Sequence, residues 1–387
     1  MLVRQNNGDT PGFDRLPCTT SAAFAYRRQH LQGGFRNWEG EVSALFCLAK
    51  AENPIMFEPA SQNRRTFIKT VGLASAGLAV SHTTLAGSLQ LPVPKRKLGR
   101  HAEMVSSLGL GGHTLATAKT IEDAIRIAHE AIDCGVTFFD NAWEYHDGRG
   151  EEWMGQALAG KRSQVFLMTK VCTHLPGNQG KAKALAMLEQ SLTRLKTDHL
   201  DLWQVHQISS EAEADSIFMP GGVIEAIEQA RQQGKIRYCG FTGHLNPRMH
   251  LRVLAHQYPF DTVQMPLSVF DAHAEGFQKL VLPELLRQGI APLAMKTLGG
   301  NAGAVKAGVV TAEEALRYTL GLPITTLISG IDSLAWLKHN TQVAANFKPF
   351  TPGEKAALEQ RAAEQKQFEP YRHWAYLDGH ARHANLA

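Results

Sequence analysis

The stretch VTFFDNAWEY, residues 136–145, decides the fold, because its pattern returns along the chain. Its first half is a short β-branched and aromatic run that is typical of a strand. The run ends in Asp140, and Tyr145 follows. QVFLMTKV, residues 164–171, has the same form and ends near Lys170, and LDLWQVHQ, residues 200–207, ends near His206. Reactive side chains at the ends of three successive strands predict one shared site.

A proton-transfer centre around Tyr145 is the chemistry that this set indicates. A phenol with its ordinary pKa of ~10 is a poor proton donor or acceptor at neutral pH. A nearby ammonium favours the phenolate, so Lys170 is expected to lower the pKa of Tyr145. Asp140 can hold Lys170 in place, and His206 can orient a substrate carbonyl or relay a proton. Each side chain alone is commonly structural, but the four together point to function.

Eight strand–helix units follow one another from about residue 95 onward. Stretches such as 121–135 have apolar residues at helical spacing and end at a glycine. The strands that we predict are 105–112, 136–142, 164–171, 200–207, 236–243, 262–269, 290–298 and 324–330. Alternating strands and helices imply parallel pairing, and eight units predict an α/β fold, a closed (β/α)₈ TIM barrel. An open doubly wound sheet is the alternative, but no glycine-rich nucleotide turn follows the first strand.

Short flanking elements complete the predicted domain. The stretch KRKLGRHAEM, residues 95–104, is expected to form a hairpin that caps the barrel bottom. The barrel is expected to span 95–349, and a helix and tail to occupy 350–387. Thr351-Pro352-Gly353-Glu354 is a capping-box start for that helix, which is expected to run to about Lys366 on the outside of the barrel. The last residues are expected to be disordered.

Composition and motifs exclude several other classes of protein. The net charge of +4 is too weak to indicate nucleic-acid binding, and no phosphate-binding loop is present. No metal-ligand spacing is recognisable, so no metal is expected, and the histidines near the C-terminus fit a frayed end better than a metal site. Cys134, Cys172 and Cys239 are expected to be buried, inert thiols, and no disulfide framework is implied.

The segment 56–88 resembles a twin-arginine export signal. Asn63-Arg64-Arg65-Thr66-Phe67 supplies the arginine pair, and the uncharged apolar stretch 71–80 is too short for a stable membrane span. Thr84-Leu85-Ala86 offers small residues for cleavage. We therefore expect the twin-arginine export machinery as a partner and a periplasmic or otherwise exported protein. The protein would stay cytoplasmic if the signal is not used.

Such a signal belongs at the N-terminus of a protein, yet residues 1–55 precede it. These residues have no sustained apolar periodicity, so we expect them to be disordered. Met56 lies shortly before the arginine pair and is the expected start of translation.

The segment FFDNAWEYHDGRGEEWMGQAL resembles the signature of the aldo-keto reductases. The motifs TKV and LDLWQVHQ supply the lysine and histidine of that family. Later blocks, among them GKIRYCGFTG, VQMPLSVFD and GIAPLAMKTLGGN, are similar in order and composition. The resemblance runs from about residue 95 to 349 and so covers the whole predicted barrel.

The resemblance implies a nicotinamide cofactor, NADP(H) or NAD(H), and hydride transfer to an aldehyde, ketone or sugar-like carbonyl. Tyr145 would protonate the developing alkoxide, Lys170 and Asp140 would tune Tyr145, and His206 would orient the carbonyl. The cofactor would be held at the ribose by Gly112 and His113, at the nicotinamide by Thr242 and Gln264, at the pyrophosphate by Met295, Lys296 and Leu298, and at the adenosine end by the stretch from Gly330 through Asp332 to Asn340.

Two blocks of the sequence depart from the family pattern. Thr242-Gly243 replaces the usual Ser-Asn, which removes one amide contact. Asp332 lies in the loop that usually carries a basic residue for the 2′-phosphate of NADP, and Trp336 replaces an arginine found in many members. A carboxylate there repels a 2′-phosphate and can accept a hydrogen bond from a free 2′-hydroxyl, so NAD(H) use is a second expectation.

Two other functions compete with the reductase. A non-catalytic nicotinamide-nucleotide-binding regulatory module could share the fold, but it would not need the lysine–tyrosine pairing. A glycosidase needs paired carboxylates at strand ends, and only Asp140 lies at such an end.

Replacement of the arginine pair, Arg64→Lys/Arg65→Lys, should retain the protein in the cytoplasm. Spheroplast fractionation beside the wild type measures this, and N-terminal sequencing of the native protein locates its start. The upstream pair offers a matched control: Arg27→Lys/Arg28→Lys should leave export unchanged. A native protein that begins at Met1 and remains cytoplasmic would contradict both expectations.

Overall fold

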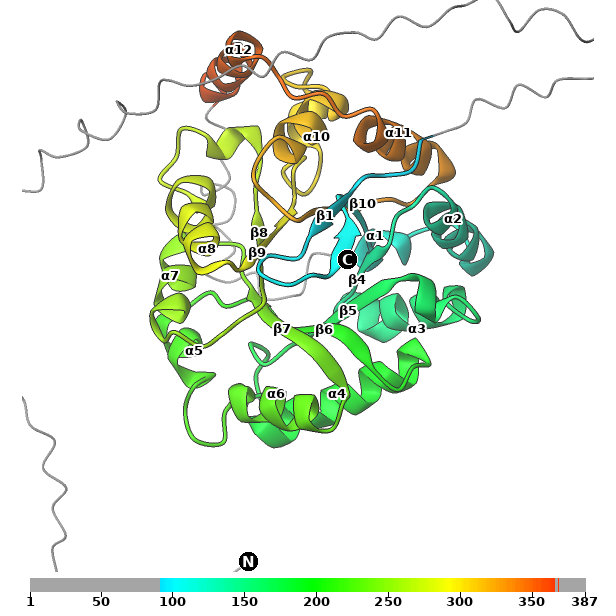
Figure 1. The fold of residues 1–387 in the computed structure, drawn as a ribbon, viewed down its shortest axis with the longest axis vertical. Coiled ribbons are helices and arrows are strands. Elements are labelled where there is room, and N and C mark those ends of the chain that lie inside the picture. Colours follow the sequence, from blue (N-terminus) through cyan, green and yellow to red (C-terminus); the bar gives the residue numbers. More distant parts are fainter. Residues whose placement is uncertain (1–90, 366–367, 369–387) are drawn as a thin grey trace, which may run out of the picture. The chain divides into compact units, whose positions relative to one another are not determined.

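A closed barrel of parallel strands, ringed by helices, forms the centre of the computed structural model, which describes residues 91–365 and Phe368 (Figure 1). The barrel strands are β3 (Leu108–Gly111), β4 (Phe138–Asp140), β5 (Phe166–Val171), β6 (Leu200–Val205), β7 (Ile236–Thr242), β8 (Thr262–Pro266), β9 (Ala291–Met295) and β10 (Thr326–Gly330). The barrel closes between β10 and β3. The predicted TIM barrel is confirmed, with each strand shorter than expected. Residues 1–88, with the predicted export signal and start, lie outside the described part.

Helices connect the strands and cover the barrel. They are α1 (Gly112–Leu115), α2 (Ile121–Asp133), α3 (Arg149–Ala157), α4 (Lys181–Leu195), α5 (Glu211–Ser216), α6 (Val223–Gln232), α7 (Pro247–Ala255), α8 (Leu282–Gln288), α9 (Gly303–Lys306), α10 (Ala312–Leu320), α11 (Leu334–Ala345) and α12 (Pro352–Ala363). The short 3₁₀ turns are η1 (Tyr145–Gly148), η2 (Arg162–Gln164) and η3 (Val269–Asp271), and η4 (Phe277–Val281) is a π-helix. The predicted glycine stop of α2 is confirmed, because Gly135 has a positive φ, and Gly234 after α6 has a positive φ as well.

The first predicted strand, 105–112, is two elements rather than one. Its beginning belongs to an antiparallel hairpin of β1 (Lys95–Lys97) and β2 (Met104–Ser106), and only its end joins the barrel as β3. Ser106 causes the break: its hydroxyl accepts hydrogen bonds from the backbone of Thr137 at 2.8 Å and Phe138 at 3.1 Å. These side-chain bonds replace ladder bonds, so pairing with β4 begins only at Gly109.

The interior of the barrel is apolar at the end that the hairpin covers. Leu98 and Val105 of the hairpin pack against Phe138, Phe166 and Met168 on the inner face of the strands. The predicted cap at the barrel bottom is therefore confirmed (Figure 1).

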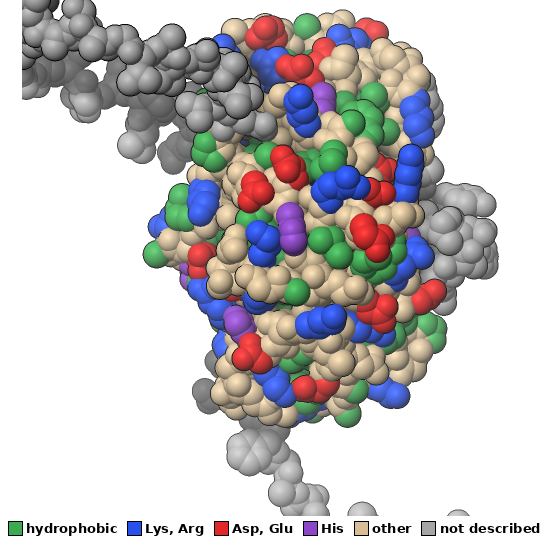
Figure 2. Space-filling view, turned by 90° about the vertical axis from the view of Figure 1, so that its right-hand side faces the viewer, with side chains coloured by type: hydrophobic (Ala, Val, Ile, Leu, Met, Phe, Trp, Pro, Cys, Tyr) green, Lys and Arg blue, Asp and Glu red, His purple; other side chains and the backbone are tan. Residues whose placement is uncertain are grey.

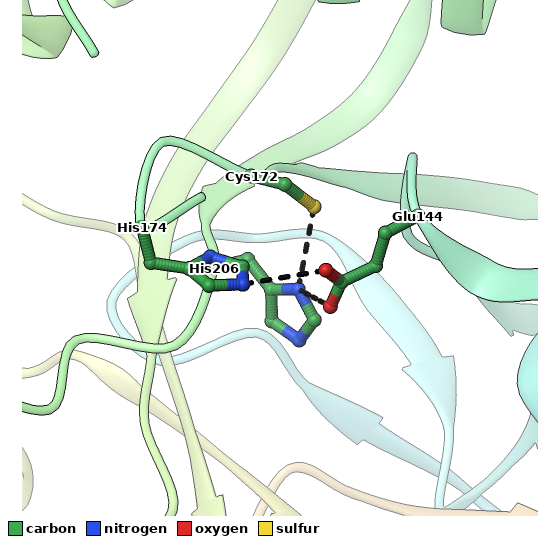
Figure 3. A group of neighbouring side chains, drawn as sticks. All are labelled: Glu144, Cys172, His174 and His206. Atoms are coloured by element: carbon green, nitrogen blue, oxygen red, sulfur yellow. Dashed lines mark hydrogen bonds and ion pairs between the residues drawn. The ribbon is translucent and has the colours of Figure 1, made fainter. Parts of the chain in front are cut away.

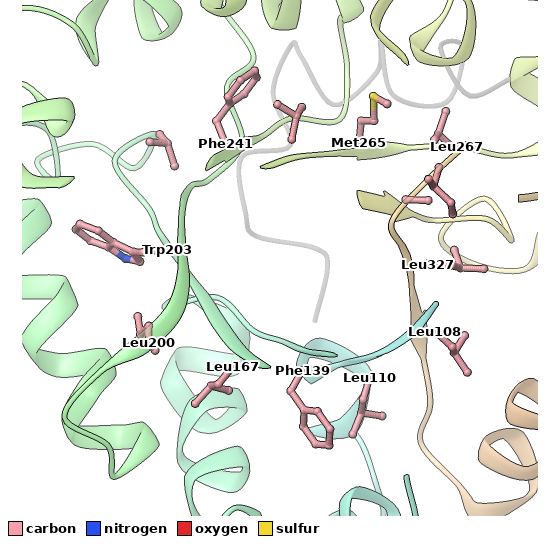
Figure 4. Close-up of a cluster of buried hydrophobic side chains, with 14 of the residues drawn as sticks. Leu108, Leu110, Phe139, Leu167, Leu200, Trp203, Phe241, Met265, Leu267 and Leu327 are labelled. Carbon is pink, nitrogen blue, oxygen red and sulfur yellow. The ribbon is translucent and has the colours of Figure 1, made fainter. Parts of the chain in front are cut away.

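A second, larger cluster fills the space between the strands and the helices. Its side chains, such as Leu110, Phe139 and Leu167, point away from the barrel axis (Figure 4). Because side chains alternate along a strand, strands such as β4, β5 and β6 contribute to both clusters.

The C-terminal helix lies outside the helical ring, as predicted (Figure 1). Thr351 and Glu354 form the expected capping box at the start of α12, which ends at Ala363, a few residues earlier than predicted. Tyr318 of α10 donates to Glu359 at 2.8 Å. Among the described residues, no helix has both the length and the apolar character needed to cross a bilayer. Basic and acidic side chains are interspersed on the face in Figure 2, which carries no extended patch of one sign.

Candidate active site

The inner face of the barrel becomes polar at the carboxyl ends of its strands. Asp140 lies two residues after the inward-facing Phe138, and Lys170 lies two residues after Met168. The alternation of a strand therefore directs both polar side chains into the barrel. Gln264 reaches the same space from β8, and its amide nitrogen lies 3.4 Å from Asp140. The structure brings these predicted residues together at the barrel mouth.

Lys170 is the most enclosed charge in this group, with 1% of its side chain exposed. Its ammonium donates to the Asp140 carboxylate at 2.5 Å and to the backbone carbonyl of Asn141 at 2.6 Å. Its third contact is the Tyr145 hydroxyl at 3.3 Å. An ammonium has three protons to donate, and these contacts account for all of them.

A tight turn positions Tyr145 above the lysine. Tyr145 begins η1, and the two following residues, His146 and Asp147, have positive φ angles of 52° and 58°. The Asn141 side chain closes the loop by donating to the carbonyl of Gly150 at 2.8 Å. His113 packs edge-on against the Tyr145 ring, with centroids 5.1 Å apart.

The predicted lowering of the Tyr145 pKa is wrong for this structure. Burial raises the pKa of Tyr145 well above its usual value, and the negative charges of Asp140 and Glu144 raise it further. Asp140 takes the short contact to Lys170, whereas Tyr145 has the longer one. The negative charge of Asp140 therefore offsets the positive charge of Lys170. The sequence-based prediction had considered the effect of Lys170 on Tyr145 without this carboxylate.

His206 lies beside Tyr145, with ring centroids 5.9 Å apart. Its Nδ1 lies 3.0 Å from Glu144 Oε1 (Figure 3). Burial alone would raise the pKa of Glu144, but hydrogen bonds with His174 and His206 hold that pKa well below its usual range. An ionised carboxylate only accepts, so Nδ1 of His206 carries a proton. Burial lowers the pKa of His206 to about 4, so the ring is neutral at pH 7.

Two of the buried polar groups that face no partner within the described residues lie at this mouth. They are the Thr242 hydroxyl and the Gln264 carbonyl oxygen, and the two residues are paired in register between β7 and β8. Gln264 also contacts the Met295 sulfur at 3.6 Å. Gly112 lies against Asp140: a Cβ there would meet the Asp140 carbonyl at 2.6 Å. These predicted residues border the same space as Tyr145 and Lys170.

The remaining predicted residues follow β9 and β10. Lys296 is half-buried with a φ of 55°, and burial together with Lys170 lowers its pKa. Leu298 is half-buried nearby in sequence. Asn340 on α11 donates to Ser329 at 2.9 Å, while Gly330 and Asp332 are exposed at the end of β10. Within the described residues, no hydrogen bond or ion pair joins these positions to Lys170.

The glycine that departs from the family pattern has a structural reason. A Cβ on Gly243 would lie 2.5 Å from the carbonyl of Ile208 and 2.6 Å from the His250 ring. An asparagine therefore does not fit without movement of the β6 loop.

Glu144, Cys172 and His174 are neighbours of His206 that the sequence analysis missed. Glu144 immediately precedes Tyr145, and Cys172 and His174 follow Lys170 at alternate positions. The alternation of side chains along β5, continued past the end of the strand, could have predicted that Cys172 and His174 lie on the same side as Lys170. This signal was weak because the three residues become neighbours only when β4, β5 and β6 lie side by side.

Comparisons with known proteins agree with the fold. The sequence model of the Aldo/keto reductase family matches residues 107–308. The uncharacterized oxidoreductase YqkF of Bacillus subtilis is 30% identical over 302 residues, which cover 68% of this chain and 95% of that protein. The 6-dehydroglucose reductase of Novosphingobium aromaticivorans is 29% identical over 225 residues, covering 55% of this chain and 71% of that protein.

A solved structure is similar as well. The holo form of aldo-keto reductase AKR11C1 from Bacillus halodurans superposes with a TM-score of 0.59 at 25% identity, covering 72% of this chain and 99% of that one.

Lys170→Met should destabilise the fold by ~3–5 kcal/mol, because it leaves the buried Asp140 carboxylate without its counter-charge. Lys170→Met/Asp140→Leu replaces the pair by apolar side chains and should recover most of that loss. Urea unfolding of both variants beside the wild type measures the difference. A double variant no more stable than the single one would contradict this account of the pair.

Proposed function

Because the chain belongs to the aldo-keto reductase family, we propose that it reduces a small-molecule carbonyl with NADPH or NADH and that Tyr145 is its general acid. The observation that carries the proposal is the contact of Lys170 with both Asp140 and the Tyr145 hydroxyl. It lies at the carboxyl ends of the barrel strands, where TIM-barrel enzymes place their active sites.

The residues at the mouth fit a nicotinamide. A carboxamide offers one N–H₂ donor and one carbonyl acceptor. Gln264 offers the buried carbonyl oxygen and Thr242 the buried hydroxyl that would complement those groups. Two buried polar groups without partners within the described residues are costly, and such a ligand would satisfy both. When bound, the cofactor supplies the hydride.

Tyr145 would deliver the proton. Its raised pKa means that the phenol keeps its proton at neutral pH and enters the reaction as an acid. The proton passes to the carbonyl oxygen as negative charge develops there. The phenolate that remains would lie 3.3 Å from the Lys170 ammonium, which stabilises it, and Asp140 holds that ammonium in place.

His206 would position the substrate. Nδ1 faces Glu144, and Nε2 points to the other side of the ring (Figure 3). In the neutral ring Nε2 is an acceptor, suited to a substrate hydroxyl next to the reacting carbonyl. Donation from Nε2 to the carbonyl oxygen itself requires a second ring proton, whose charge Glu144 would balance.

A small, polar carbonyl compound is the substrate class that we favour. A pocket beside His206 is lined by polar side chains such as His174, Gln179 and Glu213, which suit hydroxyl groups, and by the apolar side chains of Val205, Ile208 and Ile217. The names of two relatives are in keeping with such substrates: a 6-dehydroglucose reductase and the methylglyoxal reductase YeaE of Escherichia coli. A regulatory module that only binds the nucleotide is less favoured, because binding does not require Lys170 beside Tyr145.

Export remains part of the proposal. The Arg64-Arg65 segment supports transport by the twin-arginine route, which carries folded proteins, so the cofactor would cross in its bound state.

Tyr145→Phe should lower carbonyl reduction by ~10²–10⁴-fold, the usual contribution of a general acid, and should leave cofactor affinity within about twofold. Turnover on small aldehydes and sugar-like carbonyls, with a fluorescence titration of NADPH and NADH, measures both effects. Tyr318→Phe, which alters a hydroxyl on the outer helix α10, is the matched control and should keep full activity. If the Tyr145→Phe variant kept the turnover of the wild type, Tyr145 would not be the proton donor.

Asp332→Arg should raise affinity for NADPH relative to NADH by roughly fivefold, about 1 kcal/mol, because attraction replaces repulsion at the 2′-phosphate. Competing titrations of the two cofactors measure the ratio. Asp198→Arg makes the same charge change at an exposed position before β6, at the opposite end of the strand from the mouth, and should not alter the ratio. An equal effect on both cofactors would place residue 332 away from the adenosine ribose.

A further inference from the structure

Four side chains that could bind a metal ion meet at one edge of the barrel mouth. Glu144, Cys172, His174 and His206 each place one ligand atom within 4.8 Å of the others (Figure 3). Glu144 precedes η1, Cys172 and His174 follow β5, and His206 follows β6. Three neighbouring strands of the barrel thus supply the group, so its geometry is set by the barrel and not by one flexible loop.

Three of the separations between these atoms are close to those of a tetrahedral zinc site, and the group as a whole, within 4.8 Å, would contract around the ion. Zinc binds nitrogen and oxygen at ~2.0–2.2 Å and sulfur at ~2.3 Å, so tetrahedral ligands lie ~3.3 Å apart for nitrogen and oxygen and ~3.5 Å apart for nitrogen and sulfur. In the structure, His206 Nδ1 is 3.5 Å from Cys172 Sγ and 3.0 Å from a Glu144 oxygen. His174 Nε2 is 3.3 Å from the other Glu144 oxygen.

Burial and charge also favour a cation. Cys172 and His206 are buried, whereas Glu144 retains 18% side-chain exposure and His174 lines a pocket, which provides an entry path. One carboxylate and one thiolate would neutralise a divalent ion. Lys170 is a cation near this group, and its charge is already paired with Asp140 at 2.5 Å.

We propose that Glu144, Cys172, His174 and His206 form a binding site for a divalent metal ion of the zinc class. As the metal–sulfur bond forms, the Cys172 thiol releases its proton to solvent, and no electron is transferred. The inference goes beyond the proposed reductase activity, because hydride transfer requires neither Cys172 nor His174. It also revises two sequence-based expectations: that no metal would bind and that Cys172 is inert.

Metal binding is compatible with a role of His206 toward a substrate. A metal on Nδ1 takes the position of the proton that now faces Glu144, so the neutral ring carries its proton on Nε2. That nitrogen lies on the side of the ring away from the cluster (Figure 3).

Cobalt(II) titration of the reduced, metal-free full chain tests the proposal. Tetrahedral Co²⁺ with a thiolate ligand gives visible d–d bands and a near-ultraviolet charge-transfer band, and we expect both to saturate at one cobalt per chain. Zn²⁺ added afterwards should abolish them by displacement. Absence of the charge-transfer band in the wild type would overturn the proposal, whether or not any carbonyl is reduced.

Two variants and matched controls assign the site. Cys172→Ser should lose the charge-transfer band, and His174→Gln should weaken binding by at least the ~10–100-fold that the loss of an outer-shell partner costs. Cys239→Ser removes another buried cysteine, on β7, and Cys18→Ser/Cys47→Ser removes the N-terminal thiols; these variants should keep the band. A band that persists in Cys172→Ser, or disappears in the Cys18/Cys47 variant, would overturn the assignment.

X-ray absorption spectroscopy of the zinc-loaded wild type tests the site without any variant. It therefore decides the matter if circular dichroism shows that a variant fails to fold. We expect one sulfur and three nitrogen or oxygen neighbours, with imidazole scattering. A first shell without sulfur would overturn the proposal.

Discussion

Closure of eight parallel strands into one barrel is the constraint on which the rest of the molecule depends. Closure gives each strand an inner and an outer face, and side chains alternate between them. The outer face packs on the helices, and the inner face can hold only a few side chains in each layer. The hairpin closes the bottom layer with Leu98 and Val105, and the charged pair of Asp140 and Lys170 lies at the opposite, open end. The candidate active site lies at the end of the barrel interior that the hairpin does not cover.

Burial of the Lys170–Asp140 pair affects both the stability of the protein and the position of the Lys170 ammonium. A buried ammonium is unfavourable unless it is paired and hydrogen-bonded, and Lys170 has three acceptors. The same contacts fix the ammonium beside the Tyr145 hydroxyl. A charge held in place before the reaction does not have to reorganise as negative charge develops. Stability and the proposed chemistry therefore depend on one interaction.

His206 links the proposed reductase site to the proposed metal site. One ring nitrogen faces Glu144 and Cys172, and the other points away from them. Glu144 immediately precedes Tyr145 in the chain, so the two sites share a short segment of backbone. The barrel brings them together because the turns after β4, β5 and β6 are neighbours on its rim.

The strand–helix alternation, the eight strands and the capping of α12 could be predicted from the sequence, because these follow from local patterns of apolar side chains and turn residues. The sequence also indicated Asp140, Tyr145, Lys170 and His206, since reactive side chains at the ends of parallel strands must meet at one rim. The break at Ser106, the raised pKa of Tyr145 and the grouping of Glu144 with Cys172 and His174 were decided only by the tertiary structure. Each depends on distances between residues far apart in the chain, and neither apolar periodicity nor residue type encodes such distances.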